Sequence, residues 1–96
     1  MTHDLSHLHP DVREFVICLN TIEQMLAADN EHFWRRRIQK VIEIARNSDG
    51  YSVELFLGMF GGMGSFNDLV LNGSAVANSA FFKERSRASE IALKLR

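Results

Sequence analysis

The sequence predicts an all-α protein: a single compact bundle of about four helices with a glycine-rich loop after the third. Apolar residues recur at spacings of three and four along most of the chain, which is the helical period. Three clusters of turn-forming residues separate helix-length segments: Asp29-Asn30, Asn47 to Gly50, and Asn72-Gly73-Ser74. A chain of 96 residues with 46% hydrophobic residues can bury one modest core. Residues 1–96 are therefore expected to form one helical domain, with residues 1–9 mobile.

The first two helices are predicted to form an antiparallel hairpin. Pro10 suits the first turn of a helix that runs to Ala28, because its missing backbone N–H costs nothing there. The apolar stripe of this helix consists of Val12, Phe15, Val16, Leu19, Ile22, Met25 and Leu26. A second helix is predicted from Glu31 to about Asn47, buried through Phe33 or Trp34, Ile38, Val41, Ile42 and Ala45. The short connection between the two helices favours antiparallel packing.

The second half of the chain predicts two further helices. The third has Ser52 as its N-cap and runs to Phe60. It is apolar on nearly every side, which indicates a central, buried position. The final helix is predicted to begin between Ala75 and Ala80 and to reach the C-terminus. Its apolar stripe consists of Phe81 or Phe82, Ala88, Ile91, Ala92 and Leu95.

The stretch Phe60–Leu69 is the least ordinary part of the sequence, because it holds three glycines within four residues. Gly61-Gly62 is predicted to end the third helix in a left-handed C-cap, with Met63 packed against the last turn. Ser65 is predicted to begin a short helix or turn. An extended Phe66–Leu71 segment is the alternative.

Charge and cysteine content restrict the class of protein. A net charge of −1 gives no general attraction to nucleic acid or to an anionic membrane, so neither is expected as a partner. The formal charge is −4 over residues 1–30, +2 over 31–50, −2 over 51–80 and +3 over 81–96. This alternation predicts attraction between helices, within one bundle or across a dimer. Cys18 is the only cysteine and no signal peptide is recognisable, so a reducing, cytoplasmic location is expected.

The candidates for catalysis or metal binding are weak. His3, His7 and His9 lack the further rigid ligands that a metal site needs, so we interpret them as exposed polar residues. Cys18 lies among apolar residues with no basic neighbour in sequence to lower its pKa, which indicates a partly buried structural thiol. Ser65 has no histidine near it and does not lie in a Gly-x-Ser-x-Gly elbow. We therefore expect no enzyme, no metal and no cofactor.

Two motifs remain as candidate binding features. The glycine cluster fits neither a P-loop nor a dinucleotide fingerprint, so we expect it to be structural, with Asn67 and Asp68 bonded to the loop backbone. Trp34-Arg35-Arg36-Arg37 is the best nucleic-acid candidate, but consecutive residues of a helix point about 100° apart. Salt bridging or a solvated helix face is therefore the favoured interpretation, and an acidic protein partner is the alternative.

The run Gly61-Gly62-Met63-Gly64-Ser65-Phe66-Asn67-Asp68-Leu69 resembles a signature, GGMGSxNDL, of a family of small uncharacterised bacterial helical proteins. In that family the signature follows a helix, and the resemblance covers roughly residues 12–95. It implies a helical fold, but no activity and no site residues. In size and style such proteins are similar to immunity or accessory proteins encoded beside toxins.

The sequence thus favours a non-enzymatic protein-binding module, and its most specific form is an immunity or accessory protein that neutralises a bacterial toxin. The expected partner-binding residues are Met63, Ser65, Phe66, Asn67 and Asp68, with Trp34 and Arg37 as a second patch. One alternative is a small-ligand-binding protein or enzyme that uses a pocket beside Asp68, with that carboxylate as general base. The other is a homodimeric regulator.

Overall fold

Four α-helices and one short 3-10 helix make up the regular structure of residues 8–47, 49–61 and 65–96, which this computed structural model describes. In chain order the elements are α1 (Pro10–Ala28), α2 (His32–Arg46), α3 (Tyr51–Leu57), η1 (Phe66–Asp68) and α4 (Ala75–Leu95). Within the described residues there is no strand. The predicted all-α class with four main helices is therefore confirmed.

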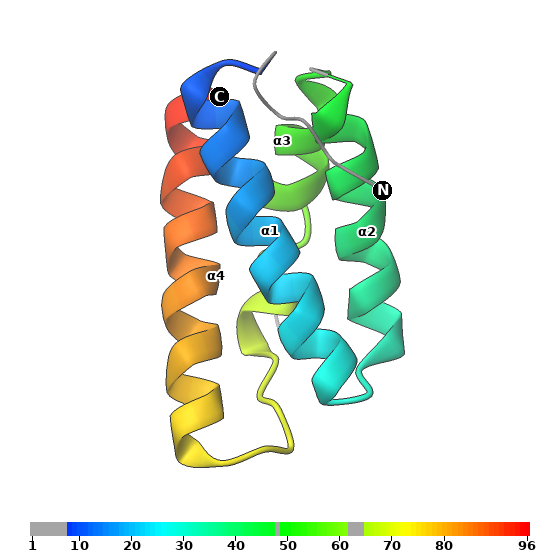
Figure 1. The fold of residues 1–96 in the computed structure, drawn as a ribbon, viewed down its shortest axis with the longest axis vertical. Helices are drawn as coiled ribbons and strands as arrows, with labels where there is room; N and C mark the ends of the chain where they lie inside the picture. The colour runs from blue at the N-terminus through cyan, green and yellow to red at the C-terminus, as the bar shows by residue number, and fades with distance from the viewer. Residues whose placement is uncertain (1–7, 48, 62–64) are drawn as a thin grey trace.

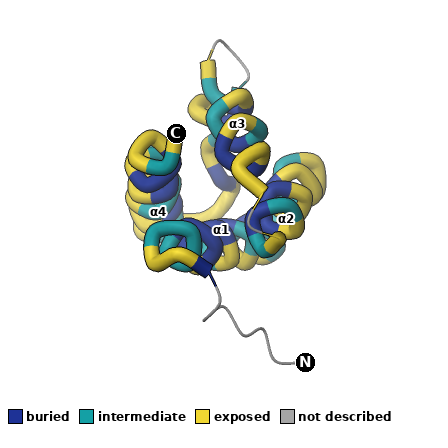
Figure 2. Tube along the Cα trace, turned by 90° about the horizontal axis from the view of Figure 1, so that it is seen from above, coloured by how far each residue is buried: buried dark blue, intermediate teal, exposed yellow. Residues whose placement is uncertain are grey.

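The three long helices lie side by side, with α1 between α4 and α2 and antiparallel to both (Figure 1). The predicted hairpin of the first two helices is therefore present. Seen from above, α3 lies across from α1 and closes the open side of this layer, so that the buried residues face a common interior (Figure 2). The segment that carries η1 returns along that same side, from the end of α3 to the start of α4 (Figure 1).

Helix ends follow the capping rules at the two longest helices. His9 precedes α1, and its Nδ1 accepts a hydrogen bond from the backbone N–H of Asp11 at 3.1 Å. Ser74 precedes α4, and its Oγ accepts from the backbone N–H of Ala77 at 3.1 Å. Of the terminal segment expected to be mobile, residues 1–7 lie outside the described residues, whereas Leu8 is buried in the core.

The core is rich in phenylalanine. The largest fully buried side chains are Phe15, Phe56, Phe66 and Phe81, from α1, α3, η1 and α4. Each contributes on the order of 1.5–3 kcal/mol through removal of its apolar surface from water. The ring centroids of Phe15 and Phe56 are 5.4 Å apart, so side chains of α1 and α3 are in contact across the interior of the bundle.

The third helix differs from its prediction in length and in burial. It begins at Tyr51 with Gly50 at the N-cap, so Ser52 is a buried residue inside the helix and the predicted cap was wrong. It also ends at Leu57, because the N–H groups of Met59 and Phe60 bond to carbonyls three positions back and tighten the turn. Tyr51 and Glu54 are exposed, so α3 covers one side of the core rather than lying at its centre. The C-cap of α3 is Gly58, with φ −67°, so the predicted left-handed C-cap at Gly61-Gly62 was wrong. Gly61 does have a positive φ, of 109°, and Gly62 lies outside the described residues.

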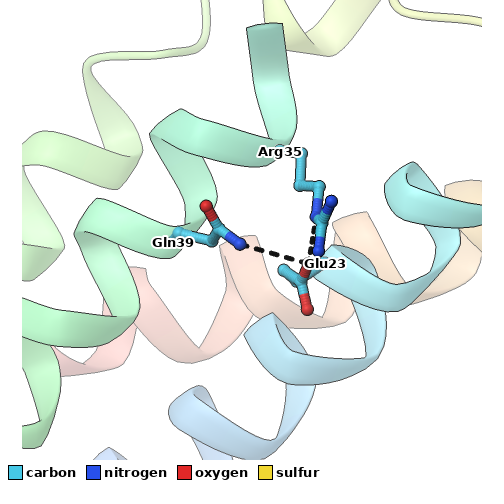
Figure 3. Close-up of polar contacts among 3 residues, drawn as sticks. All are labelled: Glu23, Arg35 and Gln39. Atoms are coloured by element: carbon cyan, nitrogen blue, oxygen red, sulfur yellow. Dashed lines mark hydrogen bonds and ion pairs between the residues drawn. The ribbon is translucent and has the colours of Figure 1, made fainter. Parts of the chain in front are cut away.

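Two ion pairs join the acidic first helix to its basic neighbours. Glu23 on α1 accepts from Arg35 on α2 at 2.5 Å and from the Gln39 amide at 3.5 Å (Figure 3). Glu14 on α1 pairs with Arg87 on α4. Some of the acidic residues of the first helix thus pair with basic residues of other helices within the bundle. Among the described residues no helix combines the length and the apolar character needed to cross a membrane.

Candidate functional site

The α3–α4 connection is built around one side chain, Phe66. It is fully buried at the N-terminal residue of η1, and its backbone N–H donates to the carbonyl of Met59 at 3.0 Å. Its ring is surrounded by other aromatic rings, at centroid distances of 5.1 Å to Trp34, 6.3 Å to Phe56, 5.7 Å to Phe60 and 5.8 Å to Phe81. A side chain so enclosed fixes the connection to three helices at once.

Arg85 on α4 holds the turn that contains Phe66. Its Nη1 donates to the carbonyl oxygens of Phe66 at 2.9 Å and Leu69 at 3.0 Å, which are the carbonyls at the two ends of the turn. The guanidinium also lies 5.0 Å from the ring centroids of both Phe81 and Phe82. Burial lowers the pKa of Arg85 from its ordinary value, and the charge of Asp68 opposes that effect. The guanidinium stays charged and binds two backbone carbonyls.

The end of the connection is tied to the bundle by two more polar side chains. The Asn78 amide on α4 bonds to both backbone groups of Leu71, at 2.8 Å and 3.0 Å. The carboxylate of Asp29, at the C-cap of α1, accepts from the backbone N–H of Asn72 at 2.8 Å. The described part of the connection, from residue 65 onward, is therefore held at several points by α1, α2 and α4.

The residues expected to form a binding surface on this connection divide into three groups. Asn67 and Asp68 are exposed, as a binding role requires. Ser65 is half-buried, and its Oγ is buried without a hydrogen-bond partner. Phe66 lies in the core, so its side chain supports the surface from below and does not reach it. Met63 lies outside the described residues.

The second expected patch lies next to the first. Trp34 on α2 is half-buried and packs on Phe66 at a centroid distance of 5.1 Å. Arg37, one turn further along α2, places its guanidinium 5.5 Å from the Trp34 ring and 5.3 Å from the Phe33 ring. The two patches that the sequence separated by about 30 residues are thus joined through the contact between Trp34 and Phe66.

Phe33 is the functional candidate that sequence reasoning missed. The sequence left open whether this residue or Trp34 is buried, and the structure places Phe33 59% exposed. The helical phase contained the signal, because Trp34 lies four and seven residues before the buried Ile38 and Val41. Phe33 therefore points away from the core, and its ring contacts that of Trp34 at 5.1 Å.

Together these side chains form a continuous line of rings across the face between α2 and α4, which we call the aromatic row. It consists of Phe33, Trp34, Phe66, Phe81 and Phe82, with successive ring centroids 5.1, 5.1, 5.8 and 6.1 Å apart. Its ends are exposed, Phe33 by 59% and Phe82 by 37%, whereas its middle is buried. A guanidinium stacks near each end. The row is thus anchored in the core and reaches solvent on two helices.

The basic residues of α2 have separate roles. Arg35 is bound to Glu23 of α1 and faces that helix (Figure 3). Arg36, Arg37 and Lys40 are exposed, and among the described residues they form no ion pair; we call these three the α2 basic face. A cavity of about 200 Å³ lies between α2 and α3, lined by Arg37, Lys40, Leu55 and Met59.

Other cavities lie on the opposite side, between α1 and α4. Their volumes are about 350, 400 and 210 Å³, and Met25 lines the latter two. Asp68 lines none of these three and does not line the cavity between α2 and α3. The pocket beside Asp68 that an enzyme would need is thus not among these four.

Cys18, the one cysteine of the chain, is a free thiol buried in the core. Burial raises the pKa of the Cys18 thiol to about 11, with a smaller contribution from the charge of Glu84. A basic neighbour that the sequence did not reveal, Arg87, opposes this shift only in part. No group of three or more potential metal ligands occurs in the described residues, and His3 and His7 lie outside them.

The fold and the site define a small helical bundle with a firmly held inter-helix connection and a row of aromatic residues that reaches solvent. Residues 27–77 match DUF6966, a domain of unknown function, and the chain belongs to this family. The matched segment begins in the last turn of α1, contains α2, α3 and η1, and ends in the first turn of α4. Comparisons with curated proteins and with solved structures find no match.

Proposed function

We propose that this protein is a non-enzymatic binding module that recognises another protein through the exposed part of the aromatic row and the α2 basic face. In its most specific form it is a cytoplasmic, bacterial immunity or accessory protein that neutralises a toxin. The observation that carries the proposal is Phe33, a large apolar side chain 59% exposed on a charged helix and covered on one side by Arg37.

The composition of this face favours protein recognition. Tryptophan, phenylalanine and arginine are enriched at protein–protein interfaces, and tryptophan and arginine dominate their binding energy. Here the three residue types are adjacent, as Phe33, Trp34 and Arg37. Exposed Asn67 and Asp68, next to the buried Phe66 that Trp34 contacts, supply polar groups suited to the rim of an interface.

The face is also fixed before any partner arrives. Trp34 packs on Phe66, and Phe66 is held through its backbone by Met59 and Arg85. A preordered surface loses less conformational entropy on association, which strengthens binding for a given contact area. A rigid base beneath an exposed aromatic residue is therefore suited to a binding module.

A pair of matched variants tests the proposal. Phe33→Ala removes an exposed ring of the row, and Tyr51→Ala removes an equally exposed ring at the start of α3, beyond the opposite end of α2 (Figure 1). Tagged wild type and both variants, shown by circular dichroism to be folded, are used to capture proteins from cells of the source organism. We expect one specific protein to be retained by wild type and by Tyr51→Ala but not by Phe33→Ala.

Two results would contradict this function. One is capture of no protein by folded wild type. The other is equal capture by wild type and Phe33→Ala, which would place the binding surface elsewhere. Asp68→Ala, included in the same experiment, reports whether the connection contributes to the interface. Light scattering of the purified chain at twice the expected mass, lost in Phe33→Ala, would instead assign the face to a homodimer.

A further inference from the structure

We propose that the cavity between α2 and α3 is an anchor pocket for one apolar side chain from an acidic segment of the protein partner. This inference rests on the proposed function and specifies the chemistry of the partner. The cavity adjoins the aromatic row, because Arg37 lines the cavity and also stacks on Phe33 and Trp34.

The size of the cavity indicates what it can hold. Its volume of about 200 Å³ is below the ~300–1,000 Å³ that pockets for free small molecules commonly have. Its apolar residues are Met59, which is buried, and Leu55, which is half-buried, while the charged residues that line it are exposed. An apolar base beneath a charged rim accommodates a single side chain of leucine or phenylalanine size, with the chain that carries it remaining at the surface.

The charge around the cavity indicates an acidic neighbour for that side chain. Arg37 and Lys40 stand one turn apart on α2, and neither forms an ion pair among the described residues. Glu43 and Glu54 are exposed on the same two helices and form no ion pair with either cation. Carboxylates on either side of the anchor residue would therefore meet unpaired cations, which raises the rate of encounter and fixes the orientation of the segment.

A nearby reporter group makes binding measurable. Trp34 is the only tryptophan of the chain, and its ring lies 5.5 Å from the Arg37 guanidinium that lines the cavity. A segment that pairs with Arg37 alters the surroundings of the indole. Tryptophan fluorescence therefore follows occupation of this site without a label.

The probe is a random library of 12-residue peptides displayed on phage and selected on the folded wild-type protein. We expect the enriched peptides to share an apolar residue flanked by Asp or Glu and to change Trp34 fluorescence saturably. Lys40→Glu, which reverses a rim charge, and Leu55→Phe, which fills the cavity without changing charge, should each weaken binding at least tenfold. Lys83→Glu is the control, because it makes the same charge change in the cavity between α1 and α4.

Several outcomes would overturn the inference. These are no enrichment, enriched peptides without acidic residues, equal binding to wild type and Leu55→Phe, or equal displacement by a 12-nucleotide single-stranded DNA. Circular dichroism excludes variants that fail to fold. The captured partner separates this inference from the proposed function. If Phe33→Ala abolishes capture of the partner while Lys40→Glu and Leu55→Phe still capture it, the proposed binding function is supported and the proposed anchor pocket is wrong.

Discussion

The side-chain amide of Asn78 pairs with both backbone groups of Leu71. The Oδ1 atom accepts from the Leu71 N–H at 2.8 Å, and the Nδ2 atom donates to the Leu71 carbonyl at 3.0 Å. The Asn78 side-chain amide thus makes the two hydrogen bonds that a neighbouring β-strand would otherwise make. It satisfies the N–H and the carbonyl of a residue that lies outside any helix. Leu71 is 6% exposed, so water cannot readily replace these bonds.

Asn78→Ala should therefore lower the free energy of unfolding by about 2 kcal/mol, because two backbone groups of a buried residue lose their partners. Asn78→Asp should cost at least as much, since its carboxylate keeps the acceptor for the Leu71 N–H but has no N–H to donate and places an oxygen against the Leu71 and Ser74 carbonyls. Urea denaturation measures both. Asn67→Ala, on an exposed residue, is the control and should change stability by less than about 0.5 kcal/mol. Equal losses at the two asparagines would contradict the assigned role.

Arg85→Lys should destabilise the protein by about 1–2 kcal/mol although the charge is kept, because an ammonium lacks the planar shape that stacks on Phe81 and Phe82 while binding two carbonyls. Amide hydrogen exchange over residues 65–71 should accelerate. Arg87→Lys makes the same change in the exposed pair with Glu14 and should have no measurable effect. If the two variants behave alike, Arg85 does not hold the turn.

Gly61→Ala and Gly50→Ala should change stability in different directions. A Cβ atom meets no neighbour within 4 Å at either position, so the backbone φ and ψ angles determine the change in stability. Gly61 has a φ of 109°, which costs a residue with a side chain on the order of 1–3 kcal/mol. Gly50 has helical angles, φ −61° and ψ −17°, and alanine there should be neutral or stabilising by about 0.5 kcal/mol. Thermal unfolding of the two variants compares them, and a neutral Gly61→Ala would show that the turn rearranges.

The Cys18 thiol should react slowly in the folded protein. Burial raises its pKa from 9.0 to about 11, so at pH 8 the thiolate fraction falls by about a hundredfold. Alkylation by iodoacetamide should be at least that much slower in native protein than in urea, as measured by mass spectrometry. A native rate within tenfold of the denatured rate would contradict the burial of Cys18.

The same pKa shift has a consequence for stability. Because the folded pKa lies above the unfolded one, the stabilisation it provides is complete below pH 9 and is lost as the pH rises towards 11. Wild type should therefore lose stability relative to Cys18→Ala across that interval. Parallel pH profiles for the two proteins would show that the thiol is not responsible.

Much of the fold follows from local rules that the sequence displays. The periods of the first, second and last helices identified their buried stripes, and Pro10 and the Ala75–Ala80 interval marked where two of them begin. These elements are long, so an amphipathic pattern persists over several turns. The third helix has seven residues, and so short a segment cannot display a reliable period. The hydrophobic pattern therefore could not predict the length of α3 or the exposure of Tyr51 and Glu54.

The candidate site depended on contacts between residues distant in sequence. The sequence identified Trp34, Arg37, Asn67 and Asp68 as candidates, but it could not show that the first pair adjoins the second. It also treated Phe66 as a surface residue, because a phenylalanine between Ser65 and Asn67 has no periodic neighbours to indicate its direction. Packing against rings from α2, α3 and α4 places that side chain in the core.

The sequence by itself therefore determined the helical class, the core stripes of the long helices and the turning points of the chain, since these depend on the order and polarity of neighbouring residues. Only the tertiary structure decided that Arg85 and Asn78 hold the connection through its backbone and that the aromatic row is continuous. These features arise from side chains brought together by packing. The local sequence around each of these side chains does not determine how far apart they lie in the folded protein.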